Sequence, residues 1–256
     1  MIDPRAVIDS SARLDENVQV GPFAVIGAGV EIGAGTRIGA HTVINGPTRI
    51  GRDNRIYSFA SIGDDPQDKK YKGEPTRLEI GDRNTIREFV TINRGTTQDQ
   101  GLTRIGDDNW IMAYVHIAHD CVIGNKTIFA NNASVAGHVR VDDYVILGGF
   151  TLIHQFCAIG AHSFTAMGSV ISKDVPPYVM VSGHMAEPHG LNSEGLQRRG
   201  FSPEALLQLR RAYKILYRSN LTMEQAREQL VEMARDCPEV GVMVEFLNRV
   251  TRGIVR

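Results

Sequence analysis

The sequence is short of the features that mark several large classes of protein. It has one tryptophan and three cysteines in 256 residues, which is too few cysteines for a disulfide scaffold and suits a reducing compartment. No apolar run approaches the roughly 20 residues of a membrane-spanning helix, and the first residues lack the layout of a secretion signal. The formal net charge is −1, so no basic excess suggests nucleic acid. We therefore expect a cytoplasmic protein with no integral membrane segment and no nucleic-acid partner.

Glycine, by contrast, is abundant, with 26 residues, and the chain carries a repeat of six residues. Large apolar side chains recur every six positions from Ile8 to Ile62, resume at Ile80, and continue after a shift of one residue from Ile105 to Ile171. This period fits neither an α-helix nor simple strand alternation. The residue two positions before each of these is mostly small, and residues two apart in a strand face the same side. We therefore predict a parallel β-helix, in which each hexad is a short strand with two inward side chains.

The repeat also predicts how the coils stack. If three hexads close one coil, residues 18 apart lie one above the other, about 4.8 Å apart along the axis. Glycine follows the large inward residue in many hexads, where we expect a sharp turn that needs a positive φ. The inward positions carry no charge, so apolar burial and continuous backbone pairing should provide most of the stability.

Two polar stretches, near 64–79 and 93–104, interrupt the repeat. Asp68 and Glu74 would occupy inward positions of a regular coil, so the first stretch is expected to leave the prism as a loop. Insertions extruded from a solenoid commonly carry function. A neutral insertion is the alternative.

The repeat ends near Val175, and the remaining sequence predicts helices. Ser202 and Pro203 open one helix that runs to about Arg218, Thr222 opens a second with a capping box, and a third starts at Pro238. We therefore divide the chain into a β-helix over 1–190 and an α-helical domain over 191–256. The first helix is rich in basic residues, which favours either a solvated face or a landing surface for an acidic partner or a phosphate.

Five of the eight histidines lie between residues 116 and 162, and none takes an inward position. His119, Gly137 and Gln155 are 18 residues apart, so they should lie on one outward edge, with His138 and His154 beside them. Imidazole is the natural general base near neutral pH. Three interpretations remain open at this point: a histidine base with other histidines orienting substrate, a zinc site, or surface histidines without function.

The most distinctive segments are residues 116–124, 131–139 and 154–162 on this edge, residues 67–77 in the first loop, and residues 192–202 before the helices. Together they closely resemble the UDP-N-acetylglucosamine O-acyltransferases of lipid A biosynthesis, a family of hexapeptide-repeat acyltransferases. The resemblance implies a left-handed, triangular and homotrimeric β-helix. It also implies transfer of a 3-hydroxyacyl chain from acyl carrier protein to the 3-hydroxyl of UDP-N-acetylglucosamine, the first step of lipid A biosynthesis. The thioester is the donor substrate, and neither a cofactor nor a metal is implied.

The same resemblance assigns roles to particular residues. It makes His119 the general base and the backbone N–H of Gly137 the oxyanion donor, while the neighbouring Asp120 would orient the imidazole. In the family the active cleft lies between adjacent subunits, so its parts here could come from different chains. The positions implied for substrate binding, the last four of them for uridine and diphosphate, are Asp68, Lys70, His116, His138, His154, Gln155, Asn192, Glu194, Arg198 and Arg199.

Met167 occupies an outward position among small residues, and the acyl-chain ruler of the family falls at this place. It follows Gly137 by 30 residues, which is under two coils and a rise of roughly 8 Å. About six methylene carbons cover that distance, so a bulky residue should stop a comparatively short chain. We therefore expect a 3-hydroxydecanoyl donor rather than a 3-hydroxymyristoyl donor.

Three other functions compete with this one. An N-acyltransferase that acts on a 3-amino UDP-sugar would have the same fold and base but a different nucleophile, and the sequence hardly separates the two. A zinc-dependent enzyme on the same scaffold is less favoured, because His116 and His119 lack the spacing of the zinc enzymes built on such repeats. A non-catalytic solenoid that binds protein is the third.

Overall fold

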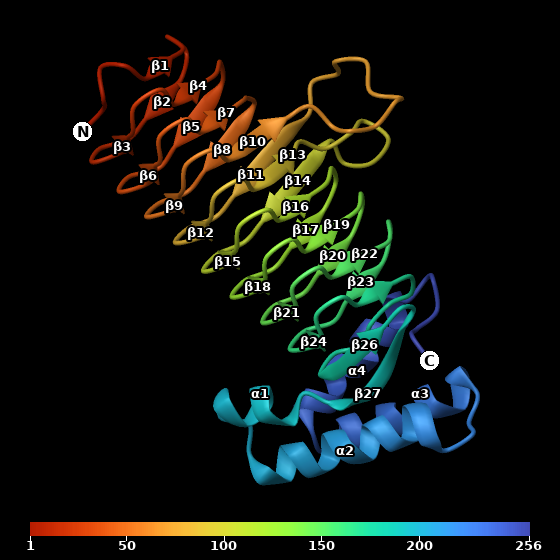
Figure 1. Ribbon diagram of the computed structural model, residues 1–256. Coiled ribbons are helices and arrows are strands. Elements are labelled where there is room, and N and C mark those ends of the chain that lie inside the picture. Colours follow the sequence, from red (N-terminus) through yellow and green to blue (C-terminus); the bar gives the residue numbers. More distant parts are fainter.

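The computed structural model describes all 256 residues as a triangular prism of parallel strands followed by a small helical part (Figure 1). The chain passes from the first sheet to the second and then to the third, and each coil adds one strand to each sheet. The coil is left-handed. The parallel β-helix predicted from the six-residue period is therefore confirmed.

The strands are short, and most contain two residues. The first sheet consists of β1 (Val7–Ile8), β4 (Val25–Ile26), β7 (Val43–Ile44), β10 (Ser61–Asp64), β13 (Thr91–Asn93), β16 (His116–Ile117), β19 (Ser134–Val135), β22 (Leu152–Ile153) and β25 (Val170–Ile171). The second consists of β2 (Arg13–Leu14), β5 (Val30–Ile32), β8 (Thr48–Ile50), β11 (Arg77–Ile80), β14 (Leu102–Ile105), β17 (Val122–Ile123), β20 (Arg140–Val141) and β23 (Ala158–Ile159). The third consists of β3 (Gln19–Val20), β6 (Arg37–Ile38), β9 (Arg55–Ile56), β12 (Thr85–Ile86), β15 (Trp110–Ile111), β18 (Ile128–Phe129), β21 (Ile146–Leu147), β24 (Phe164–Thr165), β26 (Val179–Gly183) and β27 (Ala186–Leu191).

Three corners join the sheets, and we name each by a residue or feature on it. The His119 corner joins the first sheet to the second, the Tyr144 corner joins the second to the third, and the ladder corner joins the third back to the first. Residues 18 apart pair in neighbouring coils, as His116 does with Ser134. The predicted stacking of His119, Gly137 and Gln155 on one edge follows from this register.

Several polar side chains on the inward positions are hydrogen-bonded along the axis of the prism. The side-chain oxygen of Asn54 accepts the backbone N–H of Asn84 at 2.9 Å, and that of Asn84 accepts the N–H of Asn109 at 2.9 Å. Thr165, the one large inward position without an apolar residue, has its hydroxyl 2.7 Å from that of Thr151. Because these buried groups are paired, their hydrogen bonds link neighbouring coils and offset the cost of removing the groups from water.

The predicted role of glycine at the corners is wrong. Among the glycines that follow a large inward residue, only Gly63 has a positive φ. At most corners the left-handed residue comes two positions after the place of this glycine and is often aromatic, histidine, asparagine or aspartate. The glycines are needed for close stacking instead: a Cβ at Gly33 would lie 2.7 Å from the backbone carbon of Gly51 on the next coil.

One consequence of these left-handed corner residues is a column of stacked rings on the ladder corner. The rings lie 4.9 to 5.3 Å apart between centroids, and the four aromatic ones are between 44 and 55 % exposed. We call this column the aromatic ladder; its members are Phe23, His41, Phe59, Phe89 and Tyr114. A row of half-exposed aromatic rings is unusual for a surface that faces only water.

The helical part follows a hairpin that the sequence did not predict. Strand β26 pairs parallel with β24 and antiparallel with β27. The four helices are α1 (Ser193–Arg198), α2 (Pro203–Arg218), α3 (Met223–Ala234) and α4 (Pro238–Arg249). The three predicted helices begin where expected, with Ser202 capping α2 and the capping box of Thr222 opening α3, whereas α1 was not predicted. No helix has both the length and the apolar character needed to cross a bilayer.

Candidate functional site

The two polar loops leave the prism side by side at the His119 corner (Figure 1). The first runs between β10 and β11, over 65–76, and the second between β13 and β14, over 94–101, so both are shorter than predicted. The side chain of Arg94, only 10 % exposed, pairs with the Asp65 carboxylate and donates to the Tyr71 hydroxyl at 3.1 Å. Asn93 donates to the Asp65 carbonyl at 2.7 Å. These contacts join the two loops into one unit above the corner.

His119 lies on this corner immediately after β16. Its Nδ1 is 2.8 Å from Oδ2 of Asp120, whose side chain is 1 % exposed. An ionised carboxylate can only accept, so the hydrogen is on Nδ1 and Nε2 is left with a free lone pair. Burial raises the pKa of Asp120, but hydrogen bonds from His119 and Thr96 outweigh burial and hold this pKa below its usual value. The pair is therefore an imidazole oriented by a buried carboxylate, an arrangement that suits a general base.

The second loop holds Asp120 in place. The backbone N–H of Thr96 donates to both carboxylate oxygens, at 2.9 and 3.1 Å, and its hydroxyl donates to Oδ2 at 2.6 Å. The N–H of Asp120 itself donates to the Thr103 hydroxyl at 2.8 Å. The orientation of His119 thus depends on a loop whose residues lie outside the repeat.

Gly137 lies directly against the His119 ring, one coil further along. A Cβ at this position would be 2.6 Å from Cε1 and 2.8 Å from Nε2 of the imidazole, so any side chain would displace the ring. The backbone N–H of Gly137 has no acceptor within the chain. A free N–H next to a basic nitrogen is the pairing that an oxyanion site and a general base require.

His138 completes this part of the wall. Its ring stacks on Phe156 with centroids 4.4 Å apart and meets the His119 ring edge-on at 5.1 Å. Its Nδ1 is 3.1 Å from Oδ2 of Asp99, on the second loop. Sequence reasoning identified His138 but missed Asp99, Thr96 and Phe156.

Five of the residues predicted for the site line a single cleft of about 870 Å³ between the loops and the His119 corner. The loop residues and the wall residues meet here within one chain, so this part of the cleft needs no second subunit. The five are Asp68, Lys70, His119, His138 and Gln155.

Two other predicted histidines lie near the cleft but do not line it. His116 is partly buried, with Nδ1 2.8 Å from the Thr91 hydroxyl, and its pKa is lowered by burial and then by the charge of His119. His154 is exposed and its Nδ1 lies 3.1 Å from the backbone oxygen of Gln155.

The four residues predicted for uridine and diphosphate lie around α1, on the Tyr144 corner. Asn192 caps α1 and donates to the His162 carbonyl at 3.0 Å. Arg199 donates to the Tyr144 carbonyl at 3.0 Å and lies over its ring. Glu194 and Arg198 form an exposed ion pair along the helix. Within one chain, none of the four lines the cleft of His119.

Met167 lies on the third corner, the ladder corner, and is 82 % exposed. The outward position predicted from the repeat is therefore correct. Its side chain is on a different corner from His119, so within one chain it does not border the cleft.

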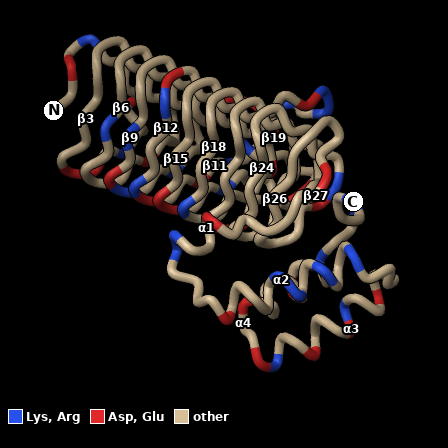
Figure 2. The backbone as a smooth tube through the Cα atoms, turned by 60° about the horizontal axis from the view of Figure 1, so that its bottom comes forward, with Lys and Arg blue, Asp and Glu red and all other residues tan.

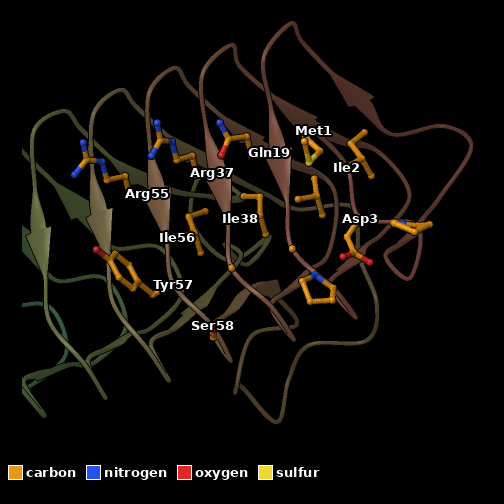
Figure 3. Close-up of a pocket in the computed structure, with 15 residues that line it drawn as sticks. Met1, Ile2, Asp3, Gln19, Arg37, Ile38, Arg55, Ile56, Tyr57 and Ser58 are labelled. Carbon is orange, nitrogen blue, oxygen red and sulfur yellow. The ribbon is translucent and has the colours of Figure 1, made fainter.

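A second hollow, of about 600 Å³, lies against the third sheet at the N-terminal end of the prism (Figure 3). Arg37 and Arg55 line it one coil apart, with Tyr57 beside them and the residues from Met1 to Pro4 at its edge. None of the predicted site residues lies there. The His119 cleft is therefore the candidate site.

One group of side chains has the composition of a metal site. The ligand atoms of His119, Asp120 and His138 lie within 4.8 Å of one another. Three such ligands are what a catalytic zinc ion takes. The zinc alternative can therefore be tested at this same cleft.

Comparison with known proteins gives consistent results along the whole chain. Family models described as Udp N-acetylglucosamine O-acyltransferase, Domain 2, and Bacterial transferase hexapeptide match residues 174–255 and residues 11–46 and 102–137, respectively. The acyl-[acyl-carrier-protein]–UDP-N-acetylglucosamine O-acyltransferase of Ectopseudomonas mendocina is 61% identical over 100% of this chain and 99% of its own. The enzyme of the same name from Thiobacillus denitrificans is 63% identical over 79% of each chain.

Solved structures of UDP-N-acetylglucosamine acyltransferases are similar to this chain over its whole length. LpxA from Acinetobacter baumannii has a TM-score of 0.98 at 49% identity, covering 100% of this chain and 99% of that one. The UDP-N-acetylglucosamine acyltransferase of Francisella novicida has a TM-score of 0.99 at 44% identity, with coverage of 100% and 94%.

Proposed function

The chain belongs to the UDP-N-acetylglucosamine O-acyltransferase family, and on that premise we propose that it transfers a 3-hydroxyacyl chain from acyl carrier protein to the 3-hydroxyl of UDP-N-acetylglucosamine. This reaction is the first step of lipid A biosynthesis. The observation that carries the proposal is the oriented His119 imidazole, which lines the cleft and lies against Gly137, a residue whose backbone N–H has no acceptor within the chain.

In the proposed mechanism, Nε2 of His119 takes the proton of the sugar hydroxyl as its oxygen attacks the thioester carbonyl carbon. The carbonyl oxygen becomes an oxyanion, which accepts a hydrogen bond from the N–H of Gly137. When the intermediate collapses, the carbon–sulfur bond breaks, and the imidazolium gives its proton to the leaving thiolate. Asp120 stabilises the imidazolium through the bond at Nδ1. The donor is the thioester itself, and no cofactor takes part.

Substrate contacts follow from the lining of the cleft. Asp68, Lys70, His138 and Gln155 present charged and polar groups for the sugar. His116 and His154 flank this group without lining the cleft. The diphosphate suits Arg198 and Arg199, because the planar guanidinium forms paired charge-assisted hydrogen bonds with phosphate oxygens.

We propose a homotrimer in which these two groups meet across subunits. Within one chain, α1 and the cleft lie on different corners of the prism, so the residues Asn192, Glu194, Arg198 and Arg199 can reach a cleft only on another copy. The half-exposed aromatic ladder on the third corner supports this association, because such a stripe is better covered by protein than by water.

For the acyl chain, we propose that Met167 of one copy limits the length of the chain bound in the cleft of another. Its 82 % exposure leaves it free to border a lipid chain. The expected donor is 3-hydroxydecanoyl. The acyl carrier protein, an acidic partner, suits the Lys and Arg residues that recur along α2 (Figure 2). A cytoplasmic location fits this partner.

The test is an assay of the purified protein with acyl carrier protein donors of graded chain length and with two acceptors, UDP-N-acetylglucosamine and its 3-amino analogue. An ester on the 3-hydroxyl, formed fastest from the ten-carbon donor and at the same rate in strong chelator, supports the proposal. Product from the amino sugar alone identifies the N-acyltransferase. Activity lost in chelator and restored by Zn²⁺ identifies the metalloenzyme, and no transfer at all leaves the binding solenoid.

A further inference from the structure

The cleft contains a second carboxylate–histidine pair besides His119 and Asp120. In this pair, Oδ2 of Asp99 is 3.1 Å from Nδ1 of His138. The two pairs share one geometry, since each carboxylate faces Nδ1 and leaves Nε2 free. They come from different parts of the chain: Asp120 follows its histidine on the corner, whereas Asp99 lies on the second loop and is 39 residues from His138.

The surroundings of His138 leave one feature of the ring for Asp99 to determine. Stacking on Phe156 and the edge-on contact with His119 fix the plane of the ring, but neither distinguishes Nδ1 from Nε2. The Asp99 carboxylate does, because it accepts the hydrogen on Nδ1. The freed Nε2 is 3.9 Å from Oδ2 of Asp120, too far for a hydrogen bond, so this nitrogen is left for a ligand in the cleft.

We propose that Asp99 is a positioning residue for acyl transfer: it holds His138 in the tautomer whose Nε2 accepts a hydrogen bond from a hydroxyl or amide N–H of the sugar substrate. The inference rests on the proposed function for its substrate. Asp99 itself lines the same cleft and is 44 % exposed in its side chain, so it can be replaced without creating a buried cavity.

The kinetic test compares Asp99→Ala, Asp99→Asn, His138→Ala and the double variant Asp99→Ala/His138→Ala. The control is Gln100→Ala, on the same loop, because Gln100 neither lines the cleft nor bonds to the wall. Asp99→Ala should lower kcat/KM for the sugar roughly 10- to 100-fold, the usual effect of losing a charge-assisted hydrogen bond. Asp99→Asn should keep most of the rate, because its amide oxygen still accepts from Nδ1. In the His138→Ala background, Asp99→Ala should lower kcat/KM no further.

Three results would overturn the inference. They are an Asp99→Ala variant with the rate of the control, an Asp99→Asn variant as slow as Asp99→Ala, or an Asp99→Ala substitution that lowers kcat/KM as much in the His138→Ala background as in the wild type. The side-chain ¹⁵N spectrum of the full-length protein gives a readout that needs no turnover. His138, assigned by its absence from His138→Ala, should carry its hydrogen on Nδ1 in the wild type and change tautomer in Asp99→Ala. A hydrogen on Nε2 in the wild type would refute the role of Asp99 whether or not the proposed transfer is observed.

Discussion

The contact between Gly137 and His119 allows a single methyl group to be used as a probe of the site. In Gly137→Ala the new Cβ would lie 2.6 Å from Cε1 of the imidazole, whereas ordinary contacts begin at 3.4 Å, so the ring must move by 0.8 Å or more. The φ angle of Gly137 is not positive, and alanine therefore strains no backbone here. A displacement of about 1 Å in a catalytic group costs roughly 100-fold in rate.

We therefore expect Gly137→Ala to fold with an unchanged melting temperature and to lose about 100-fold in kcat with the acyl carrier protein thioester and UDP-N-acetylglucosamine. The matched control is Gly149→Ala, the equivalent outward position on the ladder corner, where a Cβ would meet only the Asn131 carbonyl oxygen at 3.4 Å. A wild-type kcat in Gly137→Ala would refute the placement of His119 as base. An equal loss of kcat in both variants would show that the effect is not specific to this site.

Four further changes test other parts of the site. His119→Ala should remove nearly all turnover while the protein still folds, because the side chain lies on a corner, outside the inward positions of the prism; a near-normal rate would refute the role of His119 as the base. Thr96→Val removes a hydrogen bond that lowers the pKa of Asp120. The lowered pKa of Asp120 stabilises the folded protein above the pKa of an ordinary carboxyl group, and this stabilisation is lost as the pH falls through the pKa that Asp120 has in the folded state. The variant should have a higher folded-state pKa at Asp120, so urea unfolding should show its acid destabilisation beginning at higher pH. Met167→Gly should shift the donor preference to longer acyl chains. Unchanged selectivity in the assay with graded donors would refute the role of Met167 in limiting chain length. Phe89→Glu should shift the proposed homotrimer toward monomer in light scattering; an unaltered mass would show that the aromatic ladder is not at the interface.

The prism was predictable because its repeat can be recognised directly in the amino-acid sequence. A period of six with small and large inward side chains permits one architecture, and a spacing of 18 places His119, Gly137 and Gln155 on one edge. Those relations depend only on the repeat, so they survive any error about individual turns. The error about glycine shows the limit: the spacing located the corners but did not say which residue of each turn takes the left-handed conformation.

The supports of the site were not predictable for a related reason. Asp99 and Thr96 lie on a loop that has left the repeat, so no arithmetic of spacing connects them to His138 or Asp120. Their positions are set by how Arg94 and Tyr71 fold the two loops together, which depends on side-chain packing that a one-dimensional pattern does not contain. Sequence reasoning therefore identified His119 and His138 on the edge of the prism but missed Thr96 and Asp99, which hold Asp120 and His138 in place.

The two loops have a wider consequence for how such a chain tolerates change. Ser61 pairs with Thr91 and Thr91 with His116, 30 and 25 positions apart, instead of the usual 18. The added segments depart from a corner and rejoin it with the inward residues still aligned, Ile62 with Ile92 and Ile92 with Ile117; the register shifts only next to the first exit, where Asp64 pairs with Asn93. Length can be gained or lost at these two exits while the interior stays the same, so binding preferences and scaffold can diverge independently over generations.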